Sequence, residues 1–218
     1  MLFIPLLFLC FALEAVTWEA GAYIGYREST TTYEPLTLGA FGGIGPVELS
    51  VRFQNDEYTS RYDFSFCYDH NTRRSDHILQ AHTAWMPEEG GWTDFSYIYA
   101  YRHRWGWFTL SVEAGLGGAF AWSVYSTMLT WAVSPVVGGR MVFHILQYAD
   151  ITLFATLCYP EERDFHFTPV AGGRVDVYLG PCALFFEGYA KSAEYIIDPW
   201  FTLNAYAVRI GCSYRGEV

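Results

Sequence analysis

Charge is scarce in this chain. Only 17% of the 218 residues are Asp, Glu, Lys or Arg, whereas 52% are apolar and 19% are aromatic. The net charge of −10 and the lack of a basic run argue against a nucleic-acid partner, because phosphate binding depends on clustered Lys and Arg. Many aromatic and few charged residues are unusual for a soluble protein and typical of β-structure and membrane interfaces.

The chain also lacks the short motifs that mark common metal and catalytic sites. Its five cysteines form no CxxC pair and do not cluster with histidine, so we expect no metal site and no cofactor. Neither a nucleophile elbow nor HExxH is present. Two clusters could hold an acid–base pair: His70, Asp76 and His77, and Asp164 and His166. Both are typical of solvated turns, so we expect no catalytic residues and no enzyme.

Residues 1–15, MLFIPLLFLCFALEA, predict a secretory signal peptide. The apolar run has the length of a signal core and ends at a possible cleavage site after Ala15. No Lys or Arg precedes the run, so a misplaced start or a short anchor are the alternatives. We expect export, with residues 16–218 forming a single domain.

After the leader, apolar and polar residues alternate with a period of two, as in β-strands. Residues 135–143 (PVVGGRMVF) and 169–177 (PVAGGRVDV) nearly repeat each other at a spacing of 34 positions. Two strands of about a dozen residues, one tight turn and one loop fill that spacing. The repeat therefore predicts a β-hairpin, with Arg140 and Arg174 at equivalent positions opposite the apolar face.

The same alternation divides the chain into twelve strands, with eight or ten as alternatives. Short connections (GIGP, RWG, ILQYAD, LGP) alternate with polar ones that hold most acidic residues (RESTTTYEP, QNDEYTS, PEEGGWTD, PEERDF, SAEYIIDP). Short turns on one side and longer loops on the other are typical of transmembrane barrels, where the turns are periplasmic and the loops extracellular. The predicted fold class is all-β: an antiparallel transmembrane β-barrel.

Residues 114–139 contain no charge and are long enough for a transmembrane helix. Gly115, Gly117, Gly118 and Pro135 are poor helix residues, and both ends of the segment alternate with a period of two. The segment therefore predicts two strands that flank the uncharged loop WSVYSTM.

The apolar face of the strands carries essentially no charge, whereas the opposite face collects most of the arginines. A charge that faces lipid costs about 2–4 kcal/mol at mid-bilayer, so the charged face is expected to line the lumen. The expected lumen-lining residues are Arg27, Arg52, Arg61, Arg102, Arg140, Arg174, Arg209, Glu48, Asp63, Glu113, Asp176 and Glu187.

Every tryptophan falls at a strand end or in a connection. Transmembrane barrels carry aromatic girdles at both membrane interfaces, which places these residues there. The expected interfacial residues are Trp18, Trp85, Trp92, Trp107, Trp122, Trp131 and Trp200.

The final strand, LNAYAVRIGCSY, places Tyr206, Val208, Ile210, Cys212 and Tyr214 on one face. It resembles the C-terminal insertion signal of bacterial outer-membrane β-barrels, although RGEV follows the last aromatic residue. This architectural resemblance covers residues 16–218. It implies location in the outer membrane of a diderm bacterium, with outer-membrane lipids and the barrel-assembly machinery as partners. Among such barrels, the length and the inward arginines resemble the small porins for acidic oligosaccharides.

These features predict a narrow, porin-like channel for small hydrophilic solutes. Eight arginines and seven acidic residues share the inward phase, so strong anion selectivity is not expected. A closed barrel with an ion-paired interior that acts as a surface-exposed binding or structural protein is one alternative. An outer-membrane lipid-modifying enzyme or protease is another. Oligomeric state and a disulfide between Cys182 and Cys212 are left open.

Overall fold

The computed structural model describes residues 17–29, 33–55, 60–72, 74–87, 90–123, 126–157, 169–191 and 205–217. These residues form twelve strands: β1 (Thr17–Ser29), β2 (Tyr33–Ile44), β3 (Val47–Asn55), β4 (Ser60–Asn71), β5 (Ser75–Met86), β6 (Gly90–Trp105), β7 (Phe108–Ser123), β8 (Ser126–Ile145), β9 (Ala149–Leu157), β10 (Val170–Leu179), β11 (Cys182–Lys191) and β12 (Ala205–Glu217). Among the described residues, no helix is long and apolar enough to cross a membrane.

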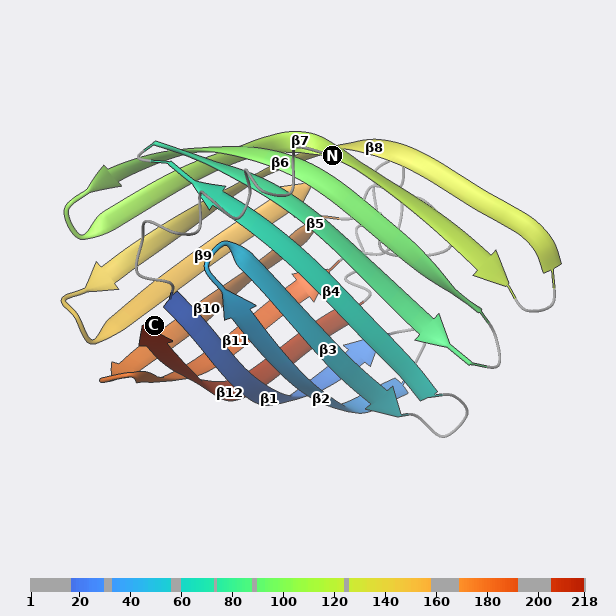
Figure 1. The fold of residues 1–218 in the computed structure, drawn as a ribbon, viewed down its shortest axis with the longest axis horizontal. Coiled ribbons are helices and arrows are strands. Elements are labelled where there is room, and N and C mark those ends of the chain that lie inside the picture. Colours follow the sequence, from blue (N-terminus) through green and yellow to red (C-terminus); the bar gives the residue numbers. More distant parts are fainter. Residues whose placement is uncertain are drawn as a thin grey trace, which may run out of the picture.

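The twelve strands close into one antiparallel barrel. Each strand pairs with its neighbours in sequence, and β1 also pairs with β12 from Thr17↔Glu217 to Ser29↔Ala205 (Figure 1). Closure leaves no unpaired sheet edge. A sheet in a bilayer requires this, because no water is present there to form hydrogen bonds with unpaired backbone N–H and C=O groups. The predicted fold class is confirmed, with twelve strands rather than eight or ten. The uncharged segment is also confirmed as two strands, because Gly115 of β7 lies opposite Val136 of β8. The predicted loop WSVYSTM between them is too long, because pairing extends β7 to Ser123 and starts β8 at Ser126.

The barrel has two different ends. At one end, two-residue turns join β2 to β3, β6 to β7 and β10 to β11. Gly45 and Gly180 begin two of these turns at positive φ (57° and 67°), which glycine adopts without strain. The first residue of β1 lies at the same end, because the Gly45 N–H donates to the Thr17 carbonyl. We call this the short-turn end and the opposite one the long-loop end; most residues of the longer connections lie outside the described residues.

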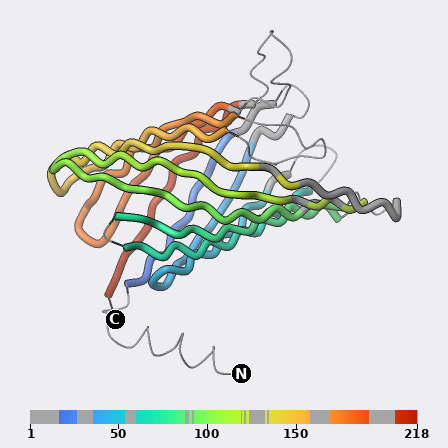
Figure 2. Tube along the Cα trace, turned by 90° about the horizontal axis from the view of Figure 1, so that it is seen from above, coloured from blue at the N-terminus to red at the C-terminus, as the bar shows by residue number. Residues whose placement is uncertain are grey.

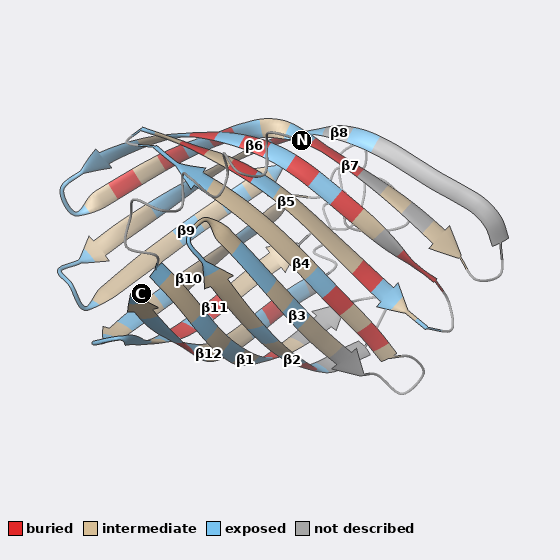
Figure 3. Ribbon diagram, viewed as in Figure 1, coloured by how far each residue is buried: buried red, intermediate tan, exposed pale blue. Residues whose placement is uncertain are grey.

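Inward and outward positions alternate cleanly along the strands. In β6, Asp94, Ser96, Ile98 and Ala100 are buried, whereas residues 95, 97, 99 and 101 between them are exposed (Figure 3). The exposed residues are Phe and Tyr, and two of the buried ones are polar. In a soluble protein, apolar residues are mostly buried and polar residues exposed. A membrane barrel requires the opposite arrangement.

The outer wall is apolar around the whole barrel. Its large exposed residues include Ile24, Leu38, Val51, Phe64, Leu79, Phe95, Val112, Val137, Leu153, Val177, Phe186 and Ile210, which come from β1 to β12 in turn. Their side chains remain about half exposed because no other part of the described chain covers them. Lipid is the solvent that such a surface fits.

The repeated Gly-Gly-Arg sequence flanks a single strand. Both β8 and β10 pair with β9, and Phe154 of β9 lies opposite Arg140 on one side and Gly172 on the other. Each repeat is the first strand of a hairpin, as predicted. The antiparallel register brings Arg140 and Arg174 to either side of β9 at nearly the same depth.

Cys182 and Cys212 do not form a disulfide. Cys182 lies opposite Tyr214, and Cys212 lies opposite Leu184, so the two cysteines are offset along β11 and β12. Both are free and exposed.

Candidate functional site: the barrel lumen

The strand register sets acidic and basic side chains directly opposite one another inside the barrel. Arg52 pairs with Asp63 across β3 and β4. Glu187 of β11 lies between Arg174 of β10 and Arg209 of β12. Cross-strand neighbours approach closely enough for opposite charges to bind. Most of the arginines that point inward are therefore held by a carboxylate.

One ion-pair network covers the inner wall of β3–β6. Asp63, whose side chain is only 2% exposed, accepts hydrogen bonds from Arg52 Nε (3.0 Å) and Arg61 Nη2 (2.9 Å). His82 joins it to a second carboxylate: His82 Nε2 lies 3.0 Å from Asp63 Oδ1, and His82 Nδ1 lies 3.0 Å from Asp94 Oδ2. We call these five residues the Asp63 network. Three donor side chains converge on a single buried carboxylate, so this wall is closely filled.

A second, more open network lies on β10–β12. Glu187 accepts from Arg209 Nη2 at 2.6 Å and lies 3.6 Å from Arg174 Nη1, while Arg174 also donates to Asp176 at 2.7 Å. The Arg174 guanidinium stands 4.2 Å above the centre of the Phe185 ring, a cation–π contact that fixes its position. Both arginine side chains stay about one-third exposed, so they remain accessible from the lumen.

Two connected cavities occupy the short-turn half of the lumen. One measures about 450 Å³ and the other about 510 Å³. Both are lined by Glu19, Phe41, Glu48, Arg140 and Arg215, so they adjoin across these residues. The larger one reaches Arg174, Glu187 and Arg209. A solute that enters from the short-turn end therefore meets fixed charges of both signs.

Among the arginines that line these cavities, Arg140 has the longest distance to its nearest carboxylate partner. Its Nη2 is 3.7 Å from Glu113 Oε1, and its side chain is 49% exposed. Arg215 is also exposed, but it donates to Glu19 at 2.7 Å. A loosely paired guanidinium in a wide aqueous space is free to interact with ions that pass.

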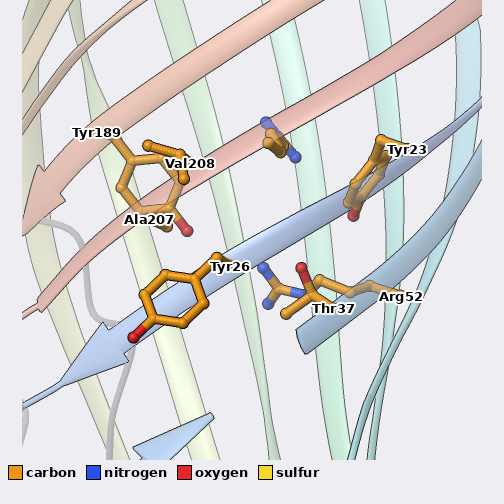
Figure 4. A pocket seen from close by; sticks show the side chains of 8 residues that line it. Tyr23, Tyr26, Thr37, Arg52, Tyr189, Ala207 and Val208 are labelled. Carbon is orange, nitrogen blue, oxygen red and sulfur yellow. The ribbon is translucent and has the colours of Figure 1, made fainter. Parts of the chain in front are cut away.

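A third, much smaller space lies against the wall nearer the long-loop end. Tyr23, Thr37, Arg52, Tyr189 and Arg209 line a space of about 10 Å³, which is about the volume that one water molecule needs. In Figure 4, Tyr23, Thr37 and Arg52 lie on one side of this space and Tyr189 on the other. These residues come from β1, β2, β3, β11 and β12, which are neighbours in the barrel, so the space lies along one side of the lumen. We call this space the wall pocket.

Inward aromatic rings lie flat against glycines on neighbouring strands. A Cβ atom built on Gly39 would lie 2.2 Å from the Tyr23 ring, and one built on Gly211 would lie 2.4 Å from the Phe185 ring. The missing side chains thus leave recesses in the wall that accept the rings. This packing holds the rings against the inner wall, where they line the lumen.

We expect Gly39→Ala to destabilise the barrel by about 1–3 kcal/mol, because the added methyl displaces the Tyr23 ring. Urea unfolding of the refolded protein in lipid vesicles measures the change. Gly42→Ala on the same strand is the matched control, since its Cβ would meet nothing closer than 3.7 Å. In a Tyr23→Ala background the Gly39→Ala cost should vanish; an unchanged cost would contradict this account of the recess.

The structure places the predicted lumen residues as follows. Arg52, Arg61 and Asp63 belong to the Asp63 network; Arg174, Arg209, Asp176 and Glu187 form the second network; Arg140, Glu113 and Glu48 face the cavities or their wall; and Arg102 pairs with Asp76 at 3.0 Å near the short-turn end. The side chain of Arg27 lies outside the described part of the chain, although its backbone is in β1.

Two lumen residues fell outside the strands that the sequence predicted. Asp94, in the predicted loop PEEGGWTD, lies inside β6, which starts at Gly90, and its side chain is 4% exposed. Arg215 follows the last alternating aromatic residue, yet β12 continues to Glu217 by pairing with β1. Both strands are longer than predicted because they pair with neighbouring strands beyond their alternating parts. Local alternation of apolar and polar residues does not indicate such pairing. His82 and Tyr23 were identifiable only by their phase in β5 and β1.

The tryptophans that the structure describes lie at both ends of the barrel. Trp18 and Trp107 lie at the short-turn end, and Trp107 is 67% exposed. Trp85 and Trp122 lie at the long-loop ends of β5 and β7. The side chains of Trp92 and Trp131, and all of Trp200, lie outside the described residues.

The catalytic candidates are not brought together. His70 and His77 lie on outward phases of β4 and β5, whereas Asp76 is 8% exposed and points inward toward Arg102. Asp164 and His166 lie outside the described residues. Within the described ranges, no group of three or more His, Cys, Asp or Glu side chains is placed to hold a metal ion.

Comparisons with solved structures identify the fold. The NanC porin aligns at a TM-score of 0.58 with 13% identity, covering 89% of this chain and 98% of that one. The translocator domain of the autotransporter NalP from Neisseria meningitidis aligns at 0.56 with 11% identity, covering 93% and 89%. The β-domain of the Bordetella autotransporter BrkA aligns at 0.53 with 10% identity, covering 92% and 99%.

No protein-family model matches the sequence, and no curated protein matches it. At these low identities the structural likeness defines the fold alone. The chain has the fold of bacterial outer-membrane β-barrels, the architecture that porins and autotransporter β-domains share.

Proposed function

We propose that the protein is an outer-membrane channel that lets small hydrophilic solutes pass through its lumen. The observation that carries this proposal is the pair of adjoining cavities, about 450 and 510 Å³, that charged side chains line inside a closed barrel. A barrel whose only role was structural would have no need of a charged space this large. The interior of a small barrel can instead be filled by its side chains.

The outer wall supports the membrane location. Exposed aliphatic and aromatic residues surround the barrel, and the ion pairs lie inside it. By the usual arrangement of such barrels, the short-turn end faces the periplasm and the long-loop end faces outward. Export by a signal peptide at residues 1–15, insertion by the barrel-assembly machinery and a single barrel domain over residues 16–218 belong to the same proposal.

We propose a narrow channel, because the ion-pair networks of both walls project into the lumen. The wall pocket has space for about one water molecule between Tyr23, Arg52 and Tyr189. Among the described residues that line it, Arg52 and Arg209 carry charge and none is acidic. Fixed guanidinium groups favour anions, so we propose mild anion preference at this point. Asp63 and Glu187, which bind these arginines from the wall, limit its strength.

The closely packed side chains inside β3–β6 favour the second candidate, a closed barrel that acts through its surface. There the Asp63 network is buried, and Ile78 and Ile98 form an apolar cluster with Val136 of β8. The two candidates differ in one property, which is whether ions cross the lumen.

We expect the refolded protein to form discrete conductance steps in planar lipid bilayers. The steps should be small, because the ion-paired side chains of both networks occupy part of the lumen. The reversal potential in a salt gradient should show a mild preference for chloride over potassium. A folded, β-rich barrel that inserts into the bilayer without conducting would contradict the channel and favour the closed barrel.

A further inference from the structure

Three histidines lie on the apolar outer wall. Among the outward positions whose side chains the structure describes, His70, His77 and His103 are the only imidazoles, and no Asp, Glu, Lys or Arg shares that face. All three lie toward the short-turn ends of the consecutive strands β4, β5 and β6. His70 and His77 lie opposite each other, whereas His103 lies four residues beyond Tyr99, the partner of His77. We call His70 and His77 the outer histidine patch.

The patch is held in a defined geometry. His70 and His77 lie directly opposite each other, with their ring centres 6.4 Å apart. His77 Nδ1 lies 2.7 Å from the Tyr97 hydroxyl, and the His77 ring packs edge-on against Tyr99 at 5.3 Å. When the Tyr97 hydroxyl donates to Nδ1, the proton of the neutral imidazole is on Nε2. That N–H is then available to an acceptor from outside the protein.

The surroundings of the patch match the headgroup region of a membrane. His103 packs against Trp105 at 4.2 Å, and Trp107 in the next turn is exposed. Tryptophan at strand ends is typical of the membrane–water interface. The turn between β4 and β5 adds Arg73 and Arg74 to the sequence next to His70, and the Arg74 side chain is exposed. This turn is basic, whereas the predicted loops at the other end are acidic.

We propose that the outer histidine patch binds the phosphate of an anionic phospholipid in the membrane leaflet at the short-turn end. The imidazole N–H groups of His70 and His77 donate to phosphate oxygens, and the exposed Arg74 in the following turn supplies a positive charge. The acyl chains lie along exposed Phe64 of β4 and Leu79 of β5, farther from that end.

A hydrogen-bond acceptor near the patch stabilises these imidazoles, because a polar group at the edge of an apolar surface loses free energy when it stays unpaired. A charged phosphodiester is a strong acceptor, and it lies in the headgroup region where strand-end tryptophans are expected. The inference rests on the proposed membrane location, but it does not depend on whether the lumen conducts.

Native mass spectrometry of the refolded, detergent-solubilised barrel tests this site. Phosphatidylglycerol should remain bound to the protein, whereas diacylglycerol with the same acyl chains, which lacks the phosphate, should not. Inorganic phosphate at millimolar concentration should fail to displace the lipid, because the acyl contacts contribute to binding. Equal retention of both lipids would overturn the proposal, and displacement by inorganic phosphate would show a site for the free ion instead.

Substitutions of His70 and His77 test whether the phospholipid binds at the outer histidine patch. His70→Leu combined with His77→Leu should weaken phosphatidylglycerol binding by at least about tenfold, the loss expected for hydrogen bonds to a charged group. Tyr97→Phe, which removes one hydroxyl that contacts His77, should weaken it less. Tyr214→Leu, an outward change at the same end on β12, is the control and should leave binding unchanged. Heat-modifiable mobility confirms folding; folded histidine variants that bind like the parent would refute the assignment.

Discussion

In the proposed channel, the Arg140→Glu variant is expected to shift the selectivity from a mild anion preference toward cations. Arg140 projects into both cavities, is about half exposed and has only a loose carboxylate neighbour. Reversing one charge changes the local charge by two units. At about 8 Å in a water-like dielectric this alters the energy of a passing ion by about 1 kcal/mol, or about fivefold in relative permeability. The reversal potential in a salt gradient measures this shift.

Two comparisons separate this effect from a general change in charge. Arg104→Glu alters the net charge equally, but Arg104 lies at the end of β6 and does not line either cavity. It should leave the reversal potential close to that of the parent. High salt should reduce the Arg140→Glu shift, because exposed charges are screened. If both variants shift the potential by the same amount, the selectivity is not set at Arg140.

The Asp63→Asn variant is expected to cause the largest loss of stability among single charge changes in the lumen. The side chain of Asp63 is 2% exposed and binds Arg52, Arg61 and His82. Removing its charge leaves buried cationic side chains without their counter-ion, which costs about 3–5 kcal/mol. Denaturant unfolding in lipid vesicles, or the temperature at which heat-modifiable mobility is lost, measures the change.

Glu19→Gln is the control for the Asp63 variant. Glu19 also accepts from an arginine, but that partner, Arg215, has a side chain that is 60% exposed. Exposed ion pairs contribute only about 0–1 kcal/mol, so the control should be close to neutral. An Asp63→Asn variant that is no less stable than Glu19→Gln would show that the Asp63 network does not hold the wall together. In the conductance assay, release of Arg52 should also change the ion preference, because Arg52 lines the wall pocket.

Much of the fold could be predicted because successive residues of a barrel strand face lipid and lumen in turn, and their polarity alternates accordingly. Phe95, Tyr97 and Tyr99 face outward and Asp94 and Ser96 face inward, so the side-chain period is visible in a short window. Strand β11 agrees with the sequence boundary, Cys182–Lys191, since a tight Gly-Pro turn precedes it. Boundaries were less accurate where pairing extends a strand beyond its alternating part, as in β12 and at the start of β6.

The candidate site was less predictable than the fold. The phase of a strand indicates that Arg52, Asp63 and His82 point inward, but it does not show which of them touch. Contact depends on register, and register depends on every turn and bulge around the barrel, such as the irregularity between Gly25 and Arg27. The glycine recess under Tyr23 is another such feature, because it joins residues of different strands.

The sequence by itself determined the strand class and the separation of apolar from charged faces. These properties depend on local alternation, which each strand carries without reference to its neighbours. Only the tertiary structure decided between twelve strands and eight or ten, which charges are paired and where the lumen is open. Closure of β1 on β12 fixes those features, because it brings strands from opposite ends of the chain into one ring and sets which side chains face each other across it.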